Sequence, residues 1–253
     1  MERYLIIVQP SRTHRPPYRF GTQMTWLGKR VLVFYGIIYV LELLLEHWMK
    51  ISVVHYLQLY PLRSENFHVW QVVSHPLIHN PGAPIGFLIN CLVFYFFAAP
   101  VETALGAWRF LKLFYLSALG GAASGLILSN VSGFQMPFMG MLPSLLSLIV
   151  LFGLLYPNAT ILLMFILPIK AKYISYGTIL ITLLTFLAKA NPHGAYHLGG
   201  MLAGYVYYRG PKELFKPDRL YASYLAWRYR RQKSRFTIID GGKNKDDDKP
   251  TYH

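Results

Sequence analysis

The stretch Ala195-Tyr196-His197-Leu198-Gly199-Gly200-Met201-Leu202-Ala203-Gly204 decides the fold class, because it places one histidine inside an apolar segment rich in glycine. Glycines four residues apart, here Gly200 and Gly204, form a small face on which a second membrane helix packs closely. An ionisable side chain in such a segment is a functional-site hypothesis by default. His197 therefore has two interpretations, a group with a chemical role or a polar bridge between helices, and the stretch alone favours neither.

The composition extends this interpretation to the whole chain. Of its 253 residues, 54% are hydrophobic and 14% are charged, and the apolar residues form long runs, as in a polytopic membrane protein. The formal net charge of +14 comes from basic residues at the two ends and in short gaps between the runs. No nucleic-acid-binding motif accompanies them. The single cysteine, Cys91, excludes an intramolecular disulfide, and no signal-peptide core is present in the first thirty residues.

Six apolar runs are expected to cross the membrane as helices, each near the length that a hydrocarbon core of about 30 Å requires. They cover residues 31–49, 84–101, 110–128, 137–155, 173–187 and 195–208. An even number of spans puts both termini on one side, and the Lys and Arg excess there marks that side as cytoplasmic. We therefore expect an all-α, six-helix membrane domain at 31–208, between a basic segment, 1–30, and a basic tail that becomes disordered, 209–253.

Polar residues beside these runs are first interpreted structurally. Glu42 and Glu46 share one helical face, and we expect them to face protein or the interface rather than lipid. The aromatic connection 50–83 is expected to lie half-submerged at the membrane surface, and the apolar stretch within 156–172 to be interfacial rather than a seventh span. The connection contains His68, His75 and His79. These histidines have neither a zinc spacing nor acidic partners, so we expect no metal site and no cofactor.

Taken in order, the segments resemble the rhomboid family of intramembrane serine proteases over residues 66–208. The motifs are Val69-Trp70-Gln71-Val72-Val73 with Leu77-Ile78-His79, Asn90, Pro100-Val101-Glu102 with Leu105-Gly106, Gly140, Leu155-Tyr156-Pro157-Asn158, and His197-Leu198-Gly199-Gly200 with Gly204. Each motif is weak alone, but their order and spacing make the resemblance specific. The segment Pro168-Ile169-Lys170-Ala171-Lys172-Tyr173 looks like a bacterial branch of the family, which implies a bacterial inner membrane.

The resemblance implies a serine–histidine dyad with an oxyanion site. In that family, a serine in a Gly-x-Ser-Gly motif opens the fourth span, and a sixth-span histidine activates it as a general base. Backbone N–H groups and a second-span His-x-x-x-Asn pair hold the oxyanion. Two of these positions are retained here, because His197 matches the base and Asn90 matches the asparagine.

The other two positions are lost. Counted without a gap from the Tyr156-Pro157-Asn158 block back to Gly140, Leu142 stands at the position of the nucleophile and Pro143 at that of the second glycine. Gly86, four residues before Asn90, stands at the position of the oxyanion histidine. Leucine has no nucleophilic atom, and proline removes a backbone N–H where an oxyanion needs donors.

Ser144 is the alternative nucleophile. It follows Leu142 by two residues, a rotation of about 200° on a helix, so it points nearly away from His197 if Leu142 points toward it. A local slip that brings Ser144 round stays open, whereas Ser124 and Ser147 are further from the expected geometry.

These residues predict a catalytically inactive pseudoprotease that binds transmembrane segments of client proteins. The alternative is an active rhomboid-type serine endopeptidase that uses Ser144 and His197. A transporter is disfavoured because no internal repeat is visible. The basic tail from Arg209 to Arg235 is expected to anchor the chain at the cytoplasmic leaflet, with anionic lipids as a candidate partner.

Overall fold

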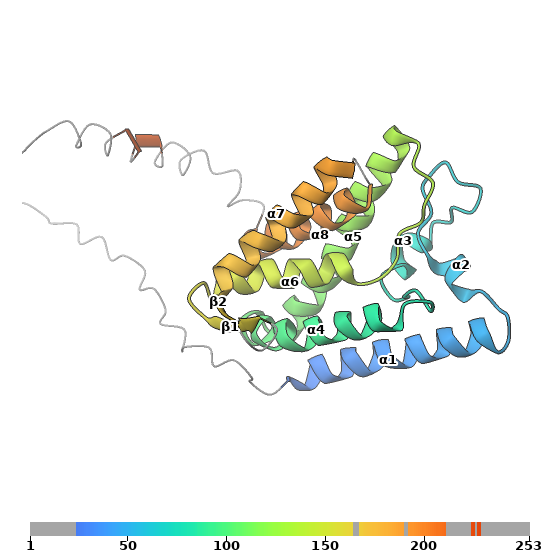
Figure 1. Ribbon diagram of the computed structural model, residues 1–253, viewed down its shortest axis with the longest axis horizontal. Helices are drawn as coiled ribbons and strands as arrows, with labels where there is room; N and C mark the ends of the chain where they lie inside the picture. Colours follow the sequence, from blue (N-terminus) through green and yellow to red (C-terminus); the bar gives the residue numbers. More distant parts are fainter. Residues whose placement is uncertain (1–23, 164–166, 190–191, 211–223, 226, 229–253) are drawn as a thin grey trace, which may run out of the picture. The chain divides into compact units, whose positions relative to one another are not determined.

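The computed structural model describes residues 24–163, 167–189, 192–210, 224–225 and 227–228 (Figure 1). The chain divides into two compact units, Met1–Arg209 and Gly210–His253, and the helices described below belong to the first. Its long helices are α1 (Trp26–His47), α4 (Pro84–Leu105), α5 (Ala107–Ser132), α6 (Leu142–Leu155), α7 (Ala171–Lys189) and α8 (Pro192–Arg209). The short elements are α2 (Val53–Leu57), α3 (Gln71–Ser74), β1 (Thr160–Leu163) and β2 (Leu167–Lys170).

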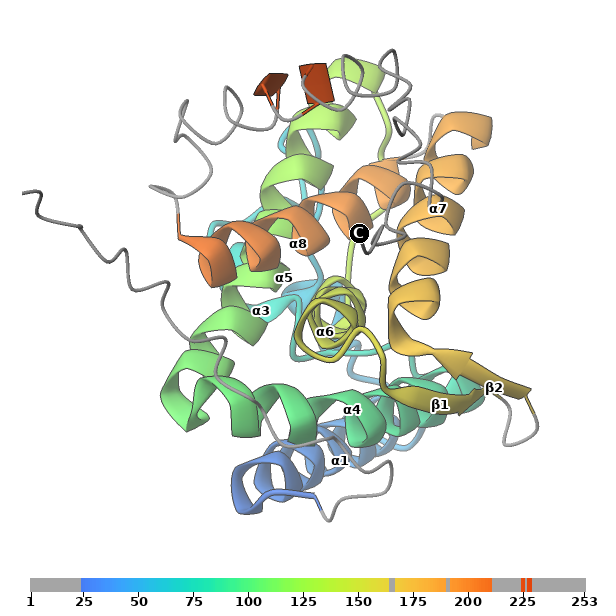
Figure 2. The ribbon, with the colours of Figure 1, turned by 90° about the vertical axis from the view of Figure 1, so that its left-hand side faces the viewer.

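Helix α6 lies at the centre of this unit. Figure 2 shows it end-on, with α4, α5, α8 and α7 arranged around it. It is a 14-residue apolar helix, and Leu145, Leu148 and Leu151 on it are fully buried. A helix that is apolar on all sides is stable only when other helices cover it. Because α6 is covered in this way, its first turn can hold a site that the surrounding helices shape.

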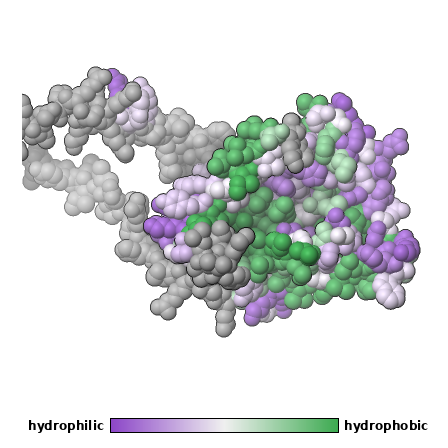
Figure 3. Space-filling model, in the orientation of Figure 1, coloured by the Kyte–Doolittle hydropathy of each residue, from purple (hydrophilic) through white to green (hydrophobic). Residues whose placement is uncertain are grey.

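Among the described residues, three helices are long and apolar enough to cross a membrane, namely Pro84–Leu105, Ala107–Ser132 and Ala171–Ala188. Their outer faces carry large exposed apolar side chains such as Ile89, Ile127 and Ile181, which is the pattern expected where a helix contacts lipid. Figure 3 shows a hydrophobic surface over the middle of the helices, with more hydrophilic residues toward the end that holds α2 and α3. The expectation of a mostly helical membrane protein is therefore confirmed in its general form.

The beginning of α1 differs from the expected span. The helix starts at Trp26 instead of residue 31, because the Thr25 hydroxyl accepts a hydrogen bond from the Gly28 N–H at 3.1 Å and caps it. The same hydroxyl donates to the Glu102 carboxylate near the end of α4. The Arg30 guanidinium lies 3.2 Å from the centre of the Trp26 ring, so charged residues are part of the first turns.

The connection between α1 and α4 is ordered around Gln71, which is fully buried. Its side-chain carbonyl accepts from the backbone N–H groups of Tyr60 and His68, and its amide donates to the carbonyl of Asn66 at 2.8 Å. The connection also pairs with the segment before α6, since Leu59 and Phe138 exchange two backbone hydrogen bonds of 2.8 Å each. This pairing explains why α6 begins at Leu142 and not at residue 137.

The apolar stretch after α6, expected to be interfacial rather than a seventh span, forms two paired antiparallel strands instead of a helix. Its register pairs Thr160 with Lys170 and Ile161 with Ile169, and Ile161 is buried against the main core. β-branched residues favour this extended pairing. In the part of the chain that the structure describes, the fold is thus α-helical with one two-stranded sheet. The expected N-terminal basic segment, 1–30, lies outside the described residues up to residue 23, and the expected tail lies outside them except for Arg209, Gly210 and residues 224–225 and 227–228.

Candidate functional site

The glycines of α8 bring this helix into direct contact with α6. A Cβ added to Gly200 would overlap Pro143 and come within 3.0 Å of its backbone, and one added to Gly204 would overlap the Ser147 hydroxyl. Both contacts advance by four residues on each helix, so α6 and α8 run parallel at this contact. The close approach is possible only because neither glycine carries a side chain.

Gly199 faces the other neighbour, α5. A Cβ at this position would lie 2.6 Å from the Ser124 Cβ and 2.7 Å from the Gly120 carbonyl oxygen. The Ser124 hydroxyl donates to the carbonyl of Ala195 at 2.8 Å, which adds a polar bridge between α5 and α8. We call the contact among α5, α6 and α8 the glycine seam, defined by Gly120, Gly121, Gly199, Gly200 and Gly204.

Gly140 lies two residues before α6, next to the glycine seam. Its φ of +88° lies in the left-handed region that favours glycine. The Gly140 N–H donates to the His75 carbonyl at 2.9 Å, and its own carbonyl accepts from the Tyr196 hydroxyl at 3.1 Å. A Cβ here would lie 3.7 Å from the His79 ring. Gly140 therefore joins the connection before α4, the first turn of α6 and the first half of α8.

Leu142, at the nucleophile position, and the two residues after it point in different directions. Ser144 is fully buried, and its hydroxyl donates to the Phe114 carbonyl of α5 at 2.5 Å. Pro143 is wedged between α5 and α8, since Cβ atoms added to Gly121 and Gly200 both meet it. Leu142 is half-buried and packs against the main core. In this arrangement, the Ser144 hydroxyl is engaged by α5.

His197 lies on α8 one turn before Gly200, on the face that Gly200 and Gly204 present to α6. It is half-buried, and its ring centre lies 5.7 Å from that of Tyr196. Its side chain makes no hydrogen bond to another side chain or backbone group in the described part of the chain. His197 therefore lies at the level at which α6 begins. The hydroxyl in the first turn of α6 is that of Ser144, and it donates to the Phe114 carbonyl of α5.

The two positions on α4 differ in burial. Asn90 is half-buried and follows the buried Phe87 by three residues, so both lie on the inward side of α4. Gly86 is exposed, and a Cβ on it would meet only the Ala83 Cβ at 3.8 Å. The position that the resemblance assigns to an oxyanion histidine is therefore on an open surface of the described chain.

A buried polar cluster lies beside Gly140. His79 is 5% exposed, and its ring contacts Tyr35, Tyr39 and Phe87 with ring centres 5.7, 6.4 and 5.0 Å away. Its backbone N–H donates to both oxygens of the Glu42 carboxylate, at 3.1 and 3.3 Å. Glu42 is 3% exposed, so this carboxylate faces protein, as its place in the sequence predicted.

Two histidines of the connection are neutral at pH 7. Burial lowers the pKa of His75 and of His79 to about 4 in each case. The His75 Nδ1–H donates to the Val72 carbonyl at 3.0 Å, while its Nε2 and both nitrogens of His79 have no partner in the described part. No group of three His, Cys, Asp or Glu side chains in the described residues is arranged to hold a metal ion.

Sequence reasoning missed the residue that joins these parts, Tyr196. It is 1% exposed, its ring stacks on Phe138 at 5.1 Å, and its hydroxyl reaches Gly140. No motif marks this tyrosine, because its role depends on segments that are far apart in the chain. A tyrosine beside a candidate catalytic histidine in an apolar helix is the only signal that pointed to it.

Fold and site together define a helical membrane protein with a polar cluster at the head of a central buried helix. Residues 30–213 match the model of a family described as "Eukaryotic integral membrane protein (DUF1751)". The chain belongs to this family. No curated protein matches the sequence. Because the family is eukaryotic, the expectation of a bacterial inner membrane is not supported, and the match does not identify the chain as a rhomboid protease.

Proposed function

We propose that this chain is a rhomboid-like, six-span membrane protein that binds transmembrane segments of other proteins without cleaving them. The observation that carries the proposal is the state of the nucleophile position. Leu142 has no reactive atom, and the hydroxyl of Ser144 donates to the Phe114 carbonyl. A serine becomes a nucleophile when its hydroxyl donates to a general base, and Ser144 donates to a backbone carbonyl instead.

The surroundings of His197 support the same proposal. Pro143 fills the space between α5 and α8, where a Gly-x-Ser-Gly motif would provide a backbone N–H for an oxyanion. Gly86 supplies no side-chain donor and faces away from the core. The base position and the asparagine position are therefore present without a nucleophile or a full oxyanion site, which is consistent with binding and not with acyl transfer.

The competing function is an active endopeptidase that uses Ser144 and His197. The full-length protein in mild detergent is incubated with a fluorophosphonate probe, and a transmembrane model substrate is tested for cleavage. We expect no labelling and no cleavage. The matched variants are Ser144→Ala and Ser129→Ala, because both serines are buried and donate to carbonyls of α5. Labelling that is lost in Ser144→Ala but kept in Ser129→Ala would overturn the proposal.

A second experiment tests whether His197 occupies the place of a base. The double variant Leu142→Ser with Pro143→Gly rebuilds a Gly-x-Ser-Gly sequence from Gly140 onward. We expect probe labelling to appear in this variant and to disappear when His197→Ala is added. A folded double variant that stays unlabelled would show that α8 does not present His197 to position 142, and the likeness to the rhomboid dyad would then fail.

A further inference from the structure

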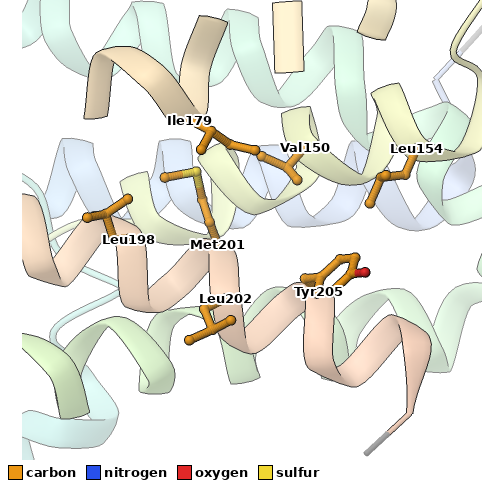
Figure 4. Close-up of a pocket in the computed structure, with 7 residues that line it drawn as sticks. All are labelled: Val150, Leu154, Ile179, Leu198, Met201, Leu202 and Tyr205. Atoms are coloured by element: carbon orange, nitrogen blue, oxygen red, sulfur yellow. The ribbon is translucent and has the colours of Figure 1, made fainter. Parts of the chain in front are cut away.

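An apolar cavity of about 430 Å³ lies among α6, α7 and α8, on the side of α8 away from α5 (Figure 4). Its walls come from Val150 and Leu154 of α6, Ile179 of α7, and Leu198, Met201, Leu202 and Tyr205 of α8. The α8 residues recur at intervals of three and four, so one continuous face of the helix lines the cavity. The nucleophile position and the polar cluster around Gly140 take no part in it.

Two close contacts hold α7 against its neighbours on either side of the cavity. Near its start, the Ser175 hydroxyl donates to the Ile149 carbonyl at 2.8 Å and packs on Gly153. Near the other end of α7, Gly194 of α8 approaches so closely that a Cβ added to it would lie 2.8 Å from the Cα of Phe186 of α7. Between these contacts, Ile179 faces a space that no side chain of the described chain fills.

The chemistry of the walls favours a hydrocarbon chain. Every lining side chain is apolar except for the Tyr205 hydroxyl. Leu202 is 63% exposed, so the cavity opens sideways to the surroundings of the helices. A whole helix, about 10 Å across, would fill 430 Å³ within about one turn, whereas cavities of this size commonly hold one small molecule. An acyl chain is thin enough to enter.

Positive charge lies at one end of the cavity. Because α6 and α8 run parallel, Leu154 and Tyr205 mark the end at which α6 and α8 finish and α7 begins. Arg209 is exposed there, and its guanidinium lies 5.9 Å from the centre of the ring of Tyr205. Lys172 lies in the first turn of α7 at the same end. The sequence contains no Asp or Glu between Glu102 and Glu213, so no acidic side chain of this stretch neutralises these cations.

We propose that the cavity binds an acyl chain of an anionic phospholipid, with the lipid phosphate against Arg209 and Lys172. The apolar walls hold the chain, and the two basic side chains select the head group, since each Lys or Arg near an anionic lipid surface strengthens binding. The inference does not depend on the proposed function, because it uses neither His197 nor the first turn of α6. Tyr205 links the two parts of the site, because its ring lines the cavity and also lies next to the Arg209 guanidinium.

The test uses the full-length protein in nanodiscs of phosphatidylcholine with a minor share of phosphatidylserine, followed by native mass spectrometry of the lipids that stay bound. We expect phosphatidylserine to be retained in preference to phosphatidylcholine. The variant Arg209→Gln with Lys172→Gln should lower this preference about 30-fold. The matched control, Arg109→Gln with Lys112→Gln, removes two exposed cations from the start of α5 and should leave the preference unchanged.

A third variant tests the acyl chain separately from the head group. Ile179→Trp fills the cavity from the exposed helix α7 and should reduce retention of both lipids. Equal losses of preference in the two charge variants would overturn the proposal in favour of general surface attraction. Retention by Ile179→Trp at the level of the unaltered protein would show that no acyl chain lies in the cavity. Displacement of both lipids by an added transmembrane peptide would make the cavity a protein-binding site.

Discussion

The two sides of α8 differ in how closely the neighbouring helices approach. On the side of α5 and α6, glycines let backbones come so near that an added Cβ at Gly199 would lie 2.7 Å from the Gly120 carbonyl oxygen. On the side of α7, a cavity of about 430 Å³ remains. Apart from the close contact between Gly194 and Phe186 near its start, α8 is therefore tightly packed on one face and lines a cavity on the other.

This difference follows from side-chain size and from the polar bridges between helices. The closed side combines glycines with serine hydroxyls, such as the 3.0 Å hydrogen bond from Ser117 to Ser147 between α5 and α6. The open side presents leucine, methionine and isoleucine, which hold helices apart and make no directional bonds. We infer that the glycine seam carries the stability of the bundle, while the α7 side is available for exchange with lipid or with other helices.

The largest expected effect is on the closed side. Gly199→Ala places a methyl group against Ser124 and the Gly120 backbone, and overpacking of this kind costs about 1–3 kcal/mol. The apparent Tm should fall by about 2–12 °C. The measurement is the fraction of folded protein after heating in detergent, followed by size-exclusion chromatography. Gly36→Ala is the control, because an added Cβ at Gly36 meets nothing within 4 Å. Equal melting temperatures for the two variants would contradict the packing of the seam.

A smaller effect is expected at the polar end of the seam, where His79 lies beside Gly140. Its pKa is lowered by burial to about 4, against about 6.5 in the unfolded chain. Between these values the unfolded state binds more protons, so stability falls as pH decreases from 7 toward 4. The loss between pH 7 and pH 5 is about 2 kcal/mol for this one histidine.

His79→Phe isolates this contribution from those of the other groups in the cluster. The aromatic ring keeps its contacts with Tyr35, Tyr39 and Phe87, and the backbone N–H that bonds to Glu42 is retained. We expect the melting temperature of the variant to decline less between pH 7 and pH 5 than that of the unaltered protein. His68→Phe is the control, because His68 is exposed. If both variants keep the original pH dependence, the titration belongs to another group.

Much of the helical plan was predictable from the sequence, because long apolar runs leave few alternatives in a membrane. The ends of the helices were not. The apolar run begins at Val31, but the helix begins five residues earlier, at Trp26. The apolar pattern does not show this start, because it is set by a side-chain hydrogen bond at Thr25. The start of α6 was placed too early because Phe138 pairs with Leu59, a contact between segments far apart in the chain.

The candidate site shows the same limit. Small residues in α8 indicated a close helix contact, but not that Gly199 faces α5 while Gly200 faces α6. The rotation of about 200° between Leu142 and Ser144 predicted different directions for the two side chains, yet the partner of Ser144, the Phe114 carbonyl, has no sequence signal. Backbone carbonyls become partners only when two helices are docked, so pattern alone does not identify them.

The smallest expected effect lies on the open side, at Gly177 of α7. An added Cβ there meets nothing within 4 Å, so Gly177→Ala introduces no clash. Alanine loses less conformational freedom than glycine in a helix, and the substitution should raise stability by about 0.5–1 kcal/mol. The same heating assay, run beside Gly199→Ala, compares a glycine of the glycine seam with a glycine of α7 that has free space around it. A clear fall in melting temperature for Gly177→Ala would mean that this face of α7 is covered in the membrane by a tightly fitting neighbour, and the open side of the molecule would then be an interface.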